Sequence, residues 1–372
     1  MAGGSSSGQE RADRHLPTAA AYEMNIVVRG TNWIGDAIMT IPALRELRRI
    51  FPDAGIVLHT RSWAESIFRD AVFIDEIVTF EKAGSPFKNV SVQSRLLSEF
   101  GFDLAVLLPN SFESALTASL ARIPRRIGYN KDLRGLLLTD PLPVPEWKEK
   151  RHEVYYYINL IAEIEKRFLG TDSVLHSELD SRLEISEERK ANARKMLSEA
   201  GVDTSRKTIA LGVGSANSRA KRWGTENYAA LNDRFQAELD ANVVLIGSKD
   251  EADVSNEVFE FARIKPIILT GKTDMAEAAA ILSVIDMLVA NDMGLAHLAP
   301  AVGTQTAVIF GPTNPVTTRP FSANATVIRK DVECSPCMLR DCPIDHRCMT
   351  RISVADVFNI CEETLAGDQN EK

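Results

Sequence analysis

The chain has 372 residues, of which 45% are hydrophobic, and it carries a formal net charge of −8. This length allows two domains of ordinary size, each with a core of its own. A net acidic chain is not typical of a general nucleic-acid-binding protein, so we expect no nucleic-acid partner. The sequence has no uninterrupted apolar run of about 18 residues and therefore predicts no membrane-spanning helix.

The first 23 residues are rich in Gly, Ser, Ala and charged residues, and they lack the apolar stretch of a secretory signal. We interpret residues 1–23 as a disordered leader and expect the folded chain to start near Met24. The lack of a signal and the clustering of most of the five cysteines favour a reducing, cytoplasmic location.

After Met24, short apolar runs alternate with segments of helical spacing. The runs typical of buried strands are residues 25–28, 56–59, part of 72–80, 104–108 and 126–129. The segments with helical spacing are residues 37–50, 62–69, 90–100, 111–120 and 152–168. Strands that alternate with helices predict βαβ units and a parallel sheet, which we assign to a first domain, residues 24–175.

The polar stretch 169–186 has few periodic apolar positions and is the best candidate for an interdomain linker. Predicted strands then follow at residues 208–211, 243–247, 267–269, 287–290 and 306–310. Predicted helices are residues 225–239, 251–263, 274–283, the segment after 291, and 354–365. We therefore predict an α/β fold of two doubly wound domains facing across a cleft, the second spanning 176–350. The final helix and tail, 351–372, are expected to pack back toward the first domain.

The stretch Asn291–Pro300 follows the predicted strand 287–290 and has the features of a helix start. Asn291 or Asp292 occupies the position of a helix N-cap, and Gly294 falls in the first turn. Free N–H groups at such a helix start commonly bind phosphate, so we predict that a nucleotide diphosphate binds here. His297 lies near the same helix start, where a lone histidine is more often structural than a ligand contact.

A glycine-containing loop follows the first strand of each half. In the second, Gly212–Trp223, the glycines allow the backbone to approach a phosphate, and Lys221 would supply positive charge for a diphosphate leaving group. The alternative is a surface loop with solvated cations. In the first, Gly30–Asp36, the carboxylate of Asp36 could act as a general base for a hydroxyl group. From its position alone, capping the helix is the commoner role.

Two other groups of residues leave their role open. The spacing Cys334-x2-Cys337-x4-Cys342-x5-Cys348 supplies four thiols that could hold zinc, but only one CxxC pair is present. A loop of reduced cysteines or a disulfide explains the cluster at least as well, so we predict no metal. A basic run in the first half suits an anionic acceptor if it faces the cleft, and is otherwise a solvated face. Its members are Arg125, Arg126, Lys131 and Arg134.

Three motifs, kept in order along the chain, resemble those of the ADP-heptose:lipopolysaccharide heptosyltransferases. They are Arg29-Gly-Thr-Asn-Trp-Ile-Gly-Asp36, Asp292-Met-Gly-Leu-Ala-His297, and Cys334-Ser-Pro-Cys337 with Cys342-Pro-Ile-Asp-His-Arg-Cys348. The resemblance runs from about Met24 to the final helix. It implies the GT-B fold, in which two Rossmann-like domains bind the acceptor on the N-terminal side and the sugar nucleotide on the C-terminal side.

The resemblance also implies an inverting, single-displacement glycosyl transfer with Asp36 as the base and Lys221 beside the diphosphate. This reverses the preference that position alone gives for Asp36. The nucleotide-sugar contacts that it implies are Gly214, Ser215, Lys221, Glu251, Asp292, Met293, Gly294, Leu295 and His297. The acceptor contacts that we expect are Arg29, Asn32, Trp33 and Arg134. Ala216 and Asn217 stand where some relatives have hydroxyl residues, which leaves the diphosphate contacts there open.

By the same resemblance, the donor is ADP-L-glycero-D-manno-heptose, and no cofactor is required. The acceptor is the inner-core heptose of lipopolysaccharide at the membrane surface, so the enzyme would be cytoplasmic and peripheral to the inner membrane. Transfer onto Kdo or another core sugar is the first alternative, and a non-catalytic nucleotide-sugar-binding protein is the second. The missing G-x-G-x-x-G spacing disfavours a dinucleotide oxidoreductase. The sequence does not indicate an oligomeric state.

Overall fold

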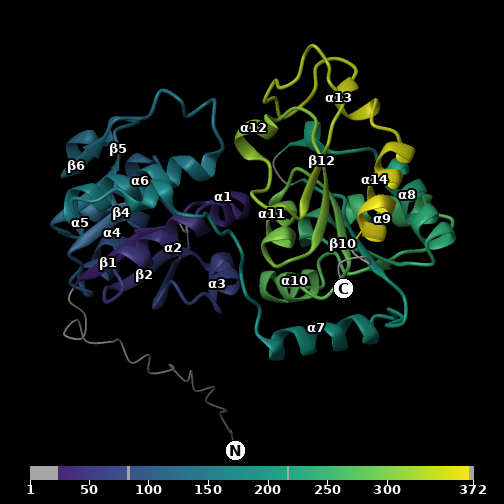
Figure 1. The fold of residues 1–372 in the computed structure, drawn as a ribbon, viewed down its shortest axis with the longest axis horizontal. Helices are drawn as coiled ribbons and strands as arrows, with labels where there is room; N and C mark the ends of the chain where they lie inside the picture. Colours follow the sequence, from purple (N-terminus) through teal and green to yellow (C-terminus); the bar gives the residue numbers. More distant parts are fainter. Residues whose placement is uncertain (1–23, 82–83, 216–217, 368–372) are drawn as a thin grey trace, which may run out of the picture.

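The computed structural model describes residues 24–81, 84–215 and 218–367. Within these ranges the chain forms two Rossmann-like domains that lie side by side and are joined by a linker near residue 180 (Figure 1). Each domain contains one six-stranded sheet with parallel pairing throughout, so the predicted α/β class is confirmed. The predicted leader and the Ala216–Asn217 pair lie outside the described residues.

The sheet of the N-terminal domain has the order β3-β2-β1-β4-β5-β6. Its strands are β1 (Asn25–Arg29), β2 (Gly55–Arg61), β3 (Glu76–Phe80), β4 (Leu104–Leu107), β5 (Arg125–Tyr129) and β6 (Asp140–Leu142). Its helices are α1 (Ile34–Met39), α2 (Ile41–Ile50), α3 (Ser62–Phe68), α4 (Pro86–Ser98), α5 (Phe112–Leu120), η1 (Arg134–Leu137), α6 (Glu153–Phe168) and η2 (Ser173–His176). The central strands β1 and β4 are largely apolar and almost completely buried, because helices cover both faces of the sheet.

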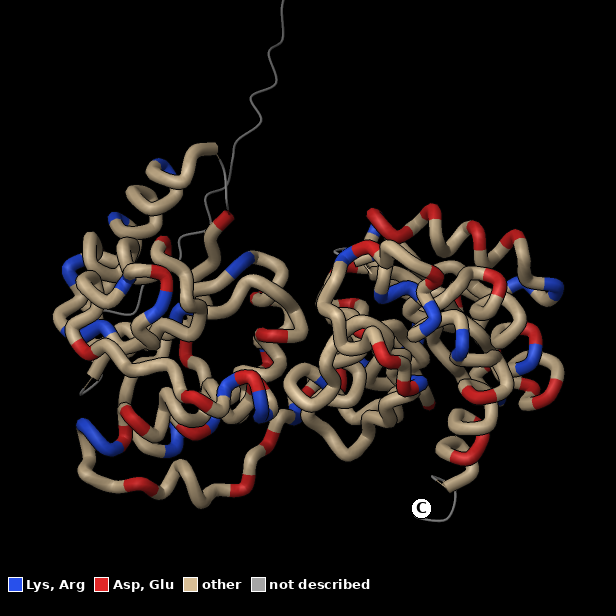
Figure 2. Tube along the Cα trace, turned by 90° about the horizontal axis from the view of Figure 1, so that it is seen from above, with Lys and Arg blue, Asp and Glu red and all other residues tan. Residues whose placement is uncertain are grey.

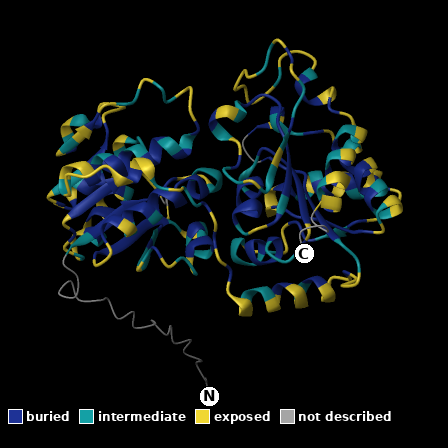
Figure 3. Cartoon of the chain, in the orientation of Figure 1, coloured by how far each residue is buried: buried dark blue, intermediate teal, exposed yellow. Residues whose placement is uncertain are grey.

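The sheet of the C-terminal domain has the order β12-β11-β10-β7-β8-β9. Its strands are β7 (Thr208–Gly212), β8 (Asn242–Leu245), β9 (Ile267–Ile268), β10 (Met287–Asn291), β11 (Gln305–Ile309) and β12 (Ala325–Ile328). The helices of this half are α7 (Glu187–Glu199), η3 (Arg219–Lys221), α8 (Thr225–Glu238), η4 (Lys249–Glu251), α9 (Ala252–Phe261), α10 (Met275–Leu282), α11 (Gly294–Ala301), α12 (Pro315–Thr318), α13 (Arg347–Thr350) and α14 (Val354–Gly367). Figure 3 shows both sheets as buried layers beneath helices whose outer faces are exposed.

The order of strands reverses beside β1 in one sheet and beside β10 in the other. Open α/β sheets bind ligands at this point, outside the carboxyl ends of the strands. Helix α1 follows β1 and helix α11 follows β10, and these two helices contact each other across the domain boundary (Figure 1). The topology therefore brings the two predicted loop–helix motifs together.

The last helix, α14, belongs to the C-terminal domain, so the prediction that the C-terminal segment packs toward the N-terminal domain is wrong for residues 351–367, and residues 368–372 lie outside the described residues. Helix α14 packs on α8 and β11, and the rings of Phe235 and Phe358 lie 5.6 Å apart. The apolar stripe of α14, which includes Phe358 and Cys361, is buried in the core of that domain. Nothing on the stripe remains to cover the other domain.

Helix α7 was not predicted because its sequence is strongly polar, with only Ala193 and Leu197 buried. It packs on α10 beneath the C-terminal domain (Figure 1). The linker before it is fixed to the same domain, since Leu183 N–H donates to Ala301 O at 2.7 Å and Ser181 donates to Phe321 O. The linker is therefore attached to the C-terminal domain from Ser181 onward.

Among the described residues, no helix is both long and apolar enough to cross a bilayer. Acidic and basic positions are interspersed over both domains in the view of Figure 2.

Candidate active site

Asn291 connects the end of β10 to the glycine loop that follows β7. Its side-chain NH₂ donates to Val213 O at 2.9 Å and Gly214 O at 3.0 Å, and its Oδ1 accepts from the Trp223 N–H at 2.9 Å. The helix N-cap is Met293, whose side chain makes no capping hydrogen bond. The predicted capping role of Asn291 or Asp292 is therefore wrong, and both polar side chains serve tertiary contacts instead.

Asp292 is the centre of a polar cluster at the start of α11. Its Oδ2 lies 2.8 Å from Nζ of Lys221 and accepts a hydrogen bond from Thr313 Oγ1 at 2.7 Å. The ammonium of Lys221 also donates to the backbone oxygen of Asp292 at 3.3 Å. Asp292 is buried while the Lys221 side chain is 27% exposed, so the cation is anchored on one side and open on the other.

The cysteine-containing loop contacts the segments that carry this polar cluster. Ala220 N–H donates to Arg340 O at 2.9 Å, and the ring Nε2 of His346 lies 2.6 Å from Ala220 O. The backbone N–H groups of Cys337 and Met338 both donate to Pro312 O. The loop thus supports the segments that carry Lys221 and Thr313. The cysteines are free thiols, and no group of His, Cys, Asp or Glu among the described residues could hold a metal ion.

Glu251 lies directly under the glycine loop. A Cβ on Gly214 would overlap Oε1 of Glu251, so only glycine permits this approach. The other carboxylate oxygen, Oε2, accepts from the N–H of Ser248 at 2.8 Å and from its hydroxyl at 3.0 Å. The structure therefore places Gly214 against Glu251, and Ser215 is buried beside them.

Asp36 sits in the first turn of α1, two residues after the helix begins, and Trp33 occupies the N-cap position. Asp36 is therefore not the helix cap. Burial, followed by the negative charge of Glu153, raises its pKa to about 6, although Lys148 and Lys221 act in the opposite direction. Such a carboxyl is ionised at neutral pH yet remains basic enough to accept a proton from a bound hydroxyl group.

Helices α1 and α11 approach each other through a reciprocal pair of glycines. A Cβ on Gly35 would come within 2.9 Å of the His297 ring, and one on Gly294 within 2.8 Å of Ile34 Cβ. The absence of both side chains brings Asp36 of one domain opposite the Asp292 cluster of the other, and Asp292 contributes to the raised pKa of Asp36.

His297 is buried at this interface, and burial lowers its pKa to about 4, so its imidazole is neutral at pH 7. Its Nε2 lies 4.0 Å from Asp292 Oδ1, and its Nδ1 has no hydrogen-bond partner among the described residues. A buried ring nitrogen without a partner is costly unless a ligand supplies one.

The sequence profile described as glycosyltransferase family 9 (heptosyltransferase) matches residues 92–347. The chain belongs to this family. It is 29% identical to lipopolysaccharide heptosyltransferase 2 of Salmonella typhimurium, over 82% of this chain and 88% of the relative. It is therefore a glycosyltransferase, as predicted.

Two solved structures of family members have the same fold. The structure of E. coli ADP-heptose lipopolysaccharide heptosyltransferase II superposes with a TM-score of 0.80 at 27% identity, covering 93% of this chain and 100% of that one. A glycosyltransferase of family 9 from Veillonella parvula superposes with a TM-score of 0.79 at 24% identity, covering 93% and 98%. These matches confirm the GT-B fold.

Of the acceptor contacts expected for this glycosyltransferase, Asn32 and Trp33 are exposed beside Asp36, and Trp33 is 57% exposed. Arg29 is buried, with its guanidinium 3.7 Å from the centre of the Phe80 ring and 3.2 Å from His59 Nδ1. Arg29 is therefore not available for direct contact with the acceptor in this structure. The same burial lowers the pKa of its guanidinium to about 9.

Arg134 is completely buried, and its predicted contact with the acceptor is wrong for the same reason. Its Nε donates to Tyr129 O at 2.8 Å, and its other nitrogens donate to Pro109 O, Ser114 Oγ and Asn110 Oδ1. Arg134 therefore ties together the loops after β4 and β5. Sequence cannot separate a cation that binds a ligand from one that organises loops.

An ion pair near Asp36 was missed. Nζ of Lys148 lies 3.1 Å and 3.0 Å from the two carboxylate oxygens of Glu153, and both side chains are mostly buried. Glu153 begins α6, whose N-cap is His152, and that ring contacts Arg319 O of the other domain at 2.6 Å. The acidic first turn after His152 is the sequence signal that could have identified Glu153.

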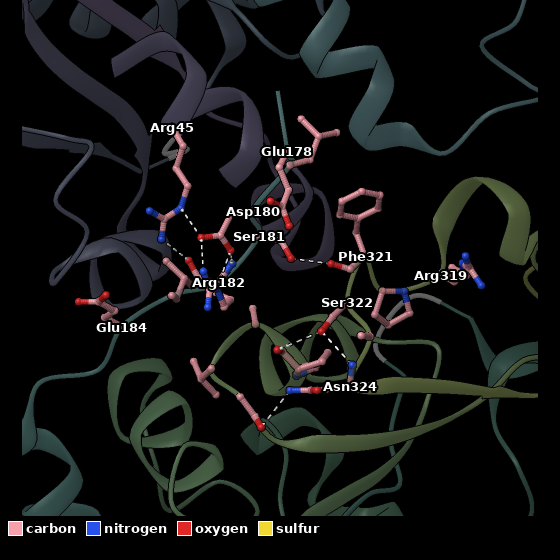
Figure 4. A pocket seen from close by; sticks show the side chains of 18 residues that line it. Arg45, Glu178, Asp180, Ser181, Arg182, Glu184, Arg319, Phe321, Ser322 and Asn324 are labelled. Carbon is pink, nitrogen blue, oxygen red and sulfur yellow. Dashed lines mark hydrogen bonds and ion pairs between the residues drawn. The ribbon is translucent and has the colours of Figure 1, made fainter. Parts of the chain in front are cut away.

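A separate cavity of about 1030 Å³ lies where the linker crosses between the domains (Figure 4). Arg45 of α2 reaches the linker there, and its Nη2 donates to Arg182 O at 2.7 Å. The cavity borders the C-terminal end of α11, residues 300–303, whereas Asp36 and Lys221 lie at the N-terminal end of that helix. It lies beside the linker and is not the candidate active site.

Proposed function

We propose that this protein transfers L-glycero-D-manno-heptose from ADP-heptose onto the inner-core heptose of lipopolysaccharide, the activity of a heptosyltransferase II. The observation that carries the proposal is the position of Asp36 on one domain opposite Lys221 and the start of α11 on the other. The named relative from Salmonella typhimurium and the E. coli structure support the choice of donor and acceptor.

The mechanism follows from the charge at each side of the cleft. Asp36 takes the proton from an acceptor hydroxyl as its oxygen forms a bond to the anomeric carbon. The bond from that carbon to the β-phosphate oxygen breaks, and its electron pair leaves with ADP. Lys221 and the free N–H groups at the start of α11 stabilise the charge that develops there. A single displacement inverts the anomeric configuration.

We assign the remaining contacts by their position. Gly214 and Ser215 border the diphosphate, Glu251 accepts hydrogen bonds from the nucleoside, and Nδ1 of His297 gains its partner from the donor. Asn32 and Trp33 contact the acceptor at the mouth of the cleft. In this scheme no metal ion or other cofactor takes part. The enzyme works in the cytoplasm at the surface of the inner membrane, where its lipid-linked acceptor is found.

The acceptor can be identified with an ADP-heptose assay that compares Kdo-lipid A with heptosyl-Kdo-lipid A by mass spectrometry. We expect a mass increase of one heptose on the heptosylated acceptor alone. Transfer onto the Kdo acceptor would instead assign a heptosyltransferase I activity. ADP binding without transfer to either acceptor would leave a nucleotide-sugar-binding protein. The Asp36→Asn variant serves as the inactive control.

Transfer should depend on the protonation of Asp36, whose pKa is raised to about 6. Since the base acts when ionised, kcat/KM should fall as the pH drops through that value. Glu153→Gln removes a charge that raises the Asp36 pKa, so the acid limb of the kcat/KM–pH profile, where activity falls at low pH, should move to lower pH. Lys148→Gln removes a charge that lowers it and should move the limb to higher pH.

The control for these pH profiles is Glu187→Gln, which changes an exposed acid on α7. It should leave the acid limb where it is in the parent enzyme. Shifts of the two test variants in the same direction would contradict the role assigned to the Lys148–Glu153 pair.

A further inference from the structure

His152 is a buried residue whose ring spans the two domains, and the proposed mechanism does not use it. It is the N-cap of α6, where its Nδ1 accepts a hydrogen bond from the Val154 N–H at 3.2 Å. Its Nε2 lies 2.6 Å from the backbone oxygen of Arg319 in the C-terminal domain. Burial lowers the pKa of the ring, and because Nδ1 accepts, the proton of the neutral ring is on Nε2, which donates to Arg319 O. Each ring nitrogen therefore has a partner, one in each domain.

Aromatic packing holds the ring of His152 in this position. The Phe321 ring lies 5.2 Å from the His152 ring and 6.1 Å from the ring of Tyr155, which is about one turn further along α6. The backbone oxygen of Phe321 accepts a hydrogen bond from Ser181 of the linker (Figure 4). The segment 319–321 is therefore fixed from two sides, by the linker and by the start of α6.

The residue that follows His152 belongs to the surroundings of the candidate base. Nζ of Lys148 lies 3.0 Å and 3.1 Å from the two carboxylate oxygens of Glu153, and the charge of Glu153 raises the pKa of Asp36. The N-cap fixes the first turn of α6, and therefore also fixes the position of Glu153. His152 thus joins the C-terminal domain to the helix start that borders Asp36.

Other contacts join the domains as well. Helices α1 and α11 pack closely at Gly35 and Gly294. Below them in the view of Figure 1, Arg189 of α7 binds the carboxylate of Asp70 in the N-terminal domain at 2.7 Å. The hydrogen bond of His152 lies toward the other end of the domain boundary, next to α12. Two bodies held at both ends of their boundary rotate against each other less than two bodies held at one end.

We propose that His152 is a positioning residue, whose hydrogen bond to Arg319 O holds the two domains in the orientation where Asp36 faces Lys221. The inference rests on the proposed function, in which Asp36 is the base on one domain and Lys221 stabilises the leaving group on the other. In this role His152 contacts neither substrate. Loss of its hydrogen bond should therefore slow the transfer step and leave the affinity for ADP, which binds to one domain, unchanged.

Two substitutions separate the two hydrogen bonds of the ring. His152→Asn keeps the cap, because asparagine is a preferred N-cap residue, but its shorter side chain does not reach Arg319 O. His152→Gln retains an amide N–H that can reach Arg319 O but is a poor cap. We expect kcat to fall by about two- to tenfold in His152→Asn, the range for the loss of one neutral hydrogen bond, and to stay near the parent value in His152→Gln.

Hydrogen exchange at the first turn of α6 should order the two variants the other way. Exchange there should be faster in His152→Gln than in His152→Asn, because the Val154 N–H loses its acceptor only in the glutamine variant. Calorimetric titration should give both variants the parent affinity for ADP. His176→Asn makes the same change at an exposed histidine of η2, and this matched control should resemble the parent in every measurement.

Small-angle X-ray scattering reports the arrangement of the domains independently of activity. His152→Asn should have a larger radius of gyration than the parent, because its domains separate more easily, whereas His152→Gln should match the parent. If the parent transferred no heptose to either acceptor, the proposed function would fail, and the scattering would still test the role of His152.

Parental kcat and parental scattering in His152→Asn would overturn the proposal. A lower kcat in His152→Gln than in His152→Asn would also overturn it, since the cap of α6 would then carry the effect. Weaker ADP binding in both variants would overturn it as well, because His152 would then act as a direct contact of the donor.

Discussion

Replacing Asp36 with asparagine should lower kcat for heptosyl transfer by about 10²- to 10⁴-fold, the contribution typical of a positioned general base. Asparagine keeps the size of the side chain but cannot accept the proton. The affinity for ADP should change little, because the proposed ADP site lies on the other domain, around Lys221 and Asp292. Single-turnover kinetics together with calorimetry would separate these two effects.

The same variant should be more stable than the parent at neutral pH. Asp36 has a folded-state pKa of about 6, against an ordinary value of 3.8 for a solvated aspartate, so ionising it opposes folding. The free-energy cost of ionising Asp36 in the folded protein is absent below pH 3.8, grows between pH 3.8 and about 6, and is complete above pH 6. Asp36→Asn should therefore raise the free energy of unfolding by on the order of 2 kcal/mol at pH 7.5 and by little at pH 3.5.

The combination of lost turnover and gained stability distinguishes a base from a residue that merely supports the fold. Thermal unfolding at the two pH values measures the second effect. Asp53→Asn, which changes an exposed acid in the turn before β2, is the control and should alter neither property. Near-parental turnover in Asp36→Asn would exclude Asp36 as the base.

Much of the fold was predictable because apolar runs and helical spacing report burial directly. β4, β7 and β10 are buried along their length, β1 is buried at all but its first residue, and all four were recognised as strands. Helix α7 was missed because only two of its side chains are buried, so it has almost no apolar periodicity to detect. The packing of α14 could not be predicted, since its apolar stripe shows that it must be covered but not by which domain.

The residues of the candidate site were predictable where they lie together in one sequence motif. They were not predictable where they come together only through contacts between distant parts of the chain. The Asp292–His297 motif and Asp36 could be read as segments, but their meeting depends on Gly35 and Gly294 fitting against His297 and Ile34. Thr313 and the Lys148–Glu153 pair come from distant parts of the chain and carry no motif of their own.

Arg134 was predicted to bind the acceptor, but every nitrogen of its side chain donates a hydrogen bond within the protein. Charge is visible in a sequence, whereas its burial depends on the folds of three loops.

Lys221→Met should have the second-largest effect, with kcat lowered by about 10²- to 10³-fold, as expected when one group that stabilises a leaving group is removed. ADP should also bind more weakly. The reason goes beyond a lost attraction, since Asp292 is buried and its Oδ2 lies 2.8 Å from the ammonium. Without Lys221, a buried and unpaired carboxylate would face the diphosphate.

That arrangement predicts a non-additive result. Lys221→Met/Asp292→Asn removes both charges, so the double variant should bind ADP more tightly than Lys221→Met while remaining slow in transfer. Arg219→Met, which alters an exposed cation in the same turn that pairs with Asp341, should resemble the parent. Isothermal titration with ADP gives the affinities of all four proteins.

If Lys221 acted only through the fold of its loop, the double variant would be no better than the single one, because both would lack the same anchor. If Lys221 contacts ADP and Asp292 only holds it there, relief of the unpaired carboxylate must restore part of the ADP affinity and none of the rate. Unchanged ADP affinity in Lys221→Met would place the diphosphate elsewhere in the cleft and remove Lys221 from the leaving-group side.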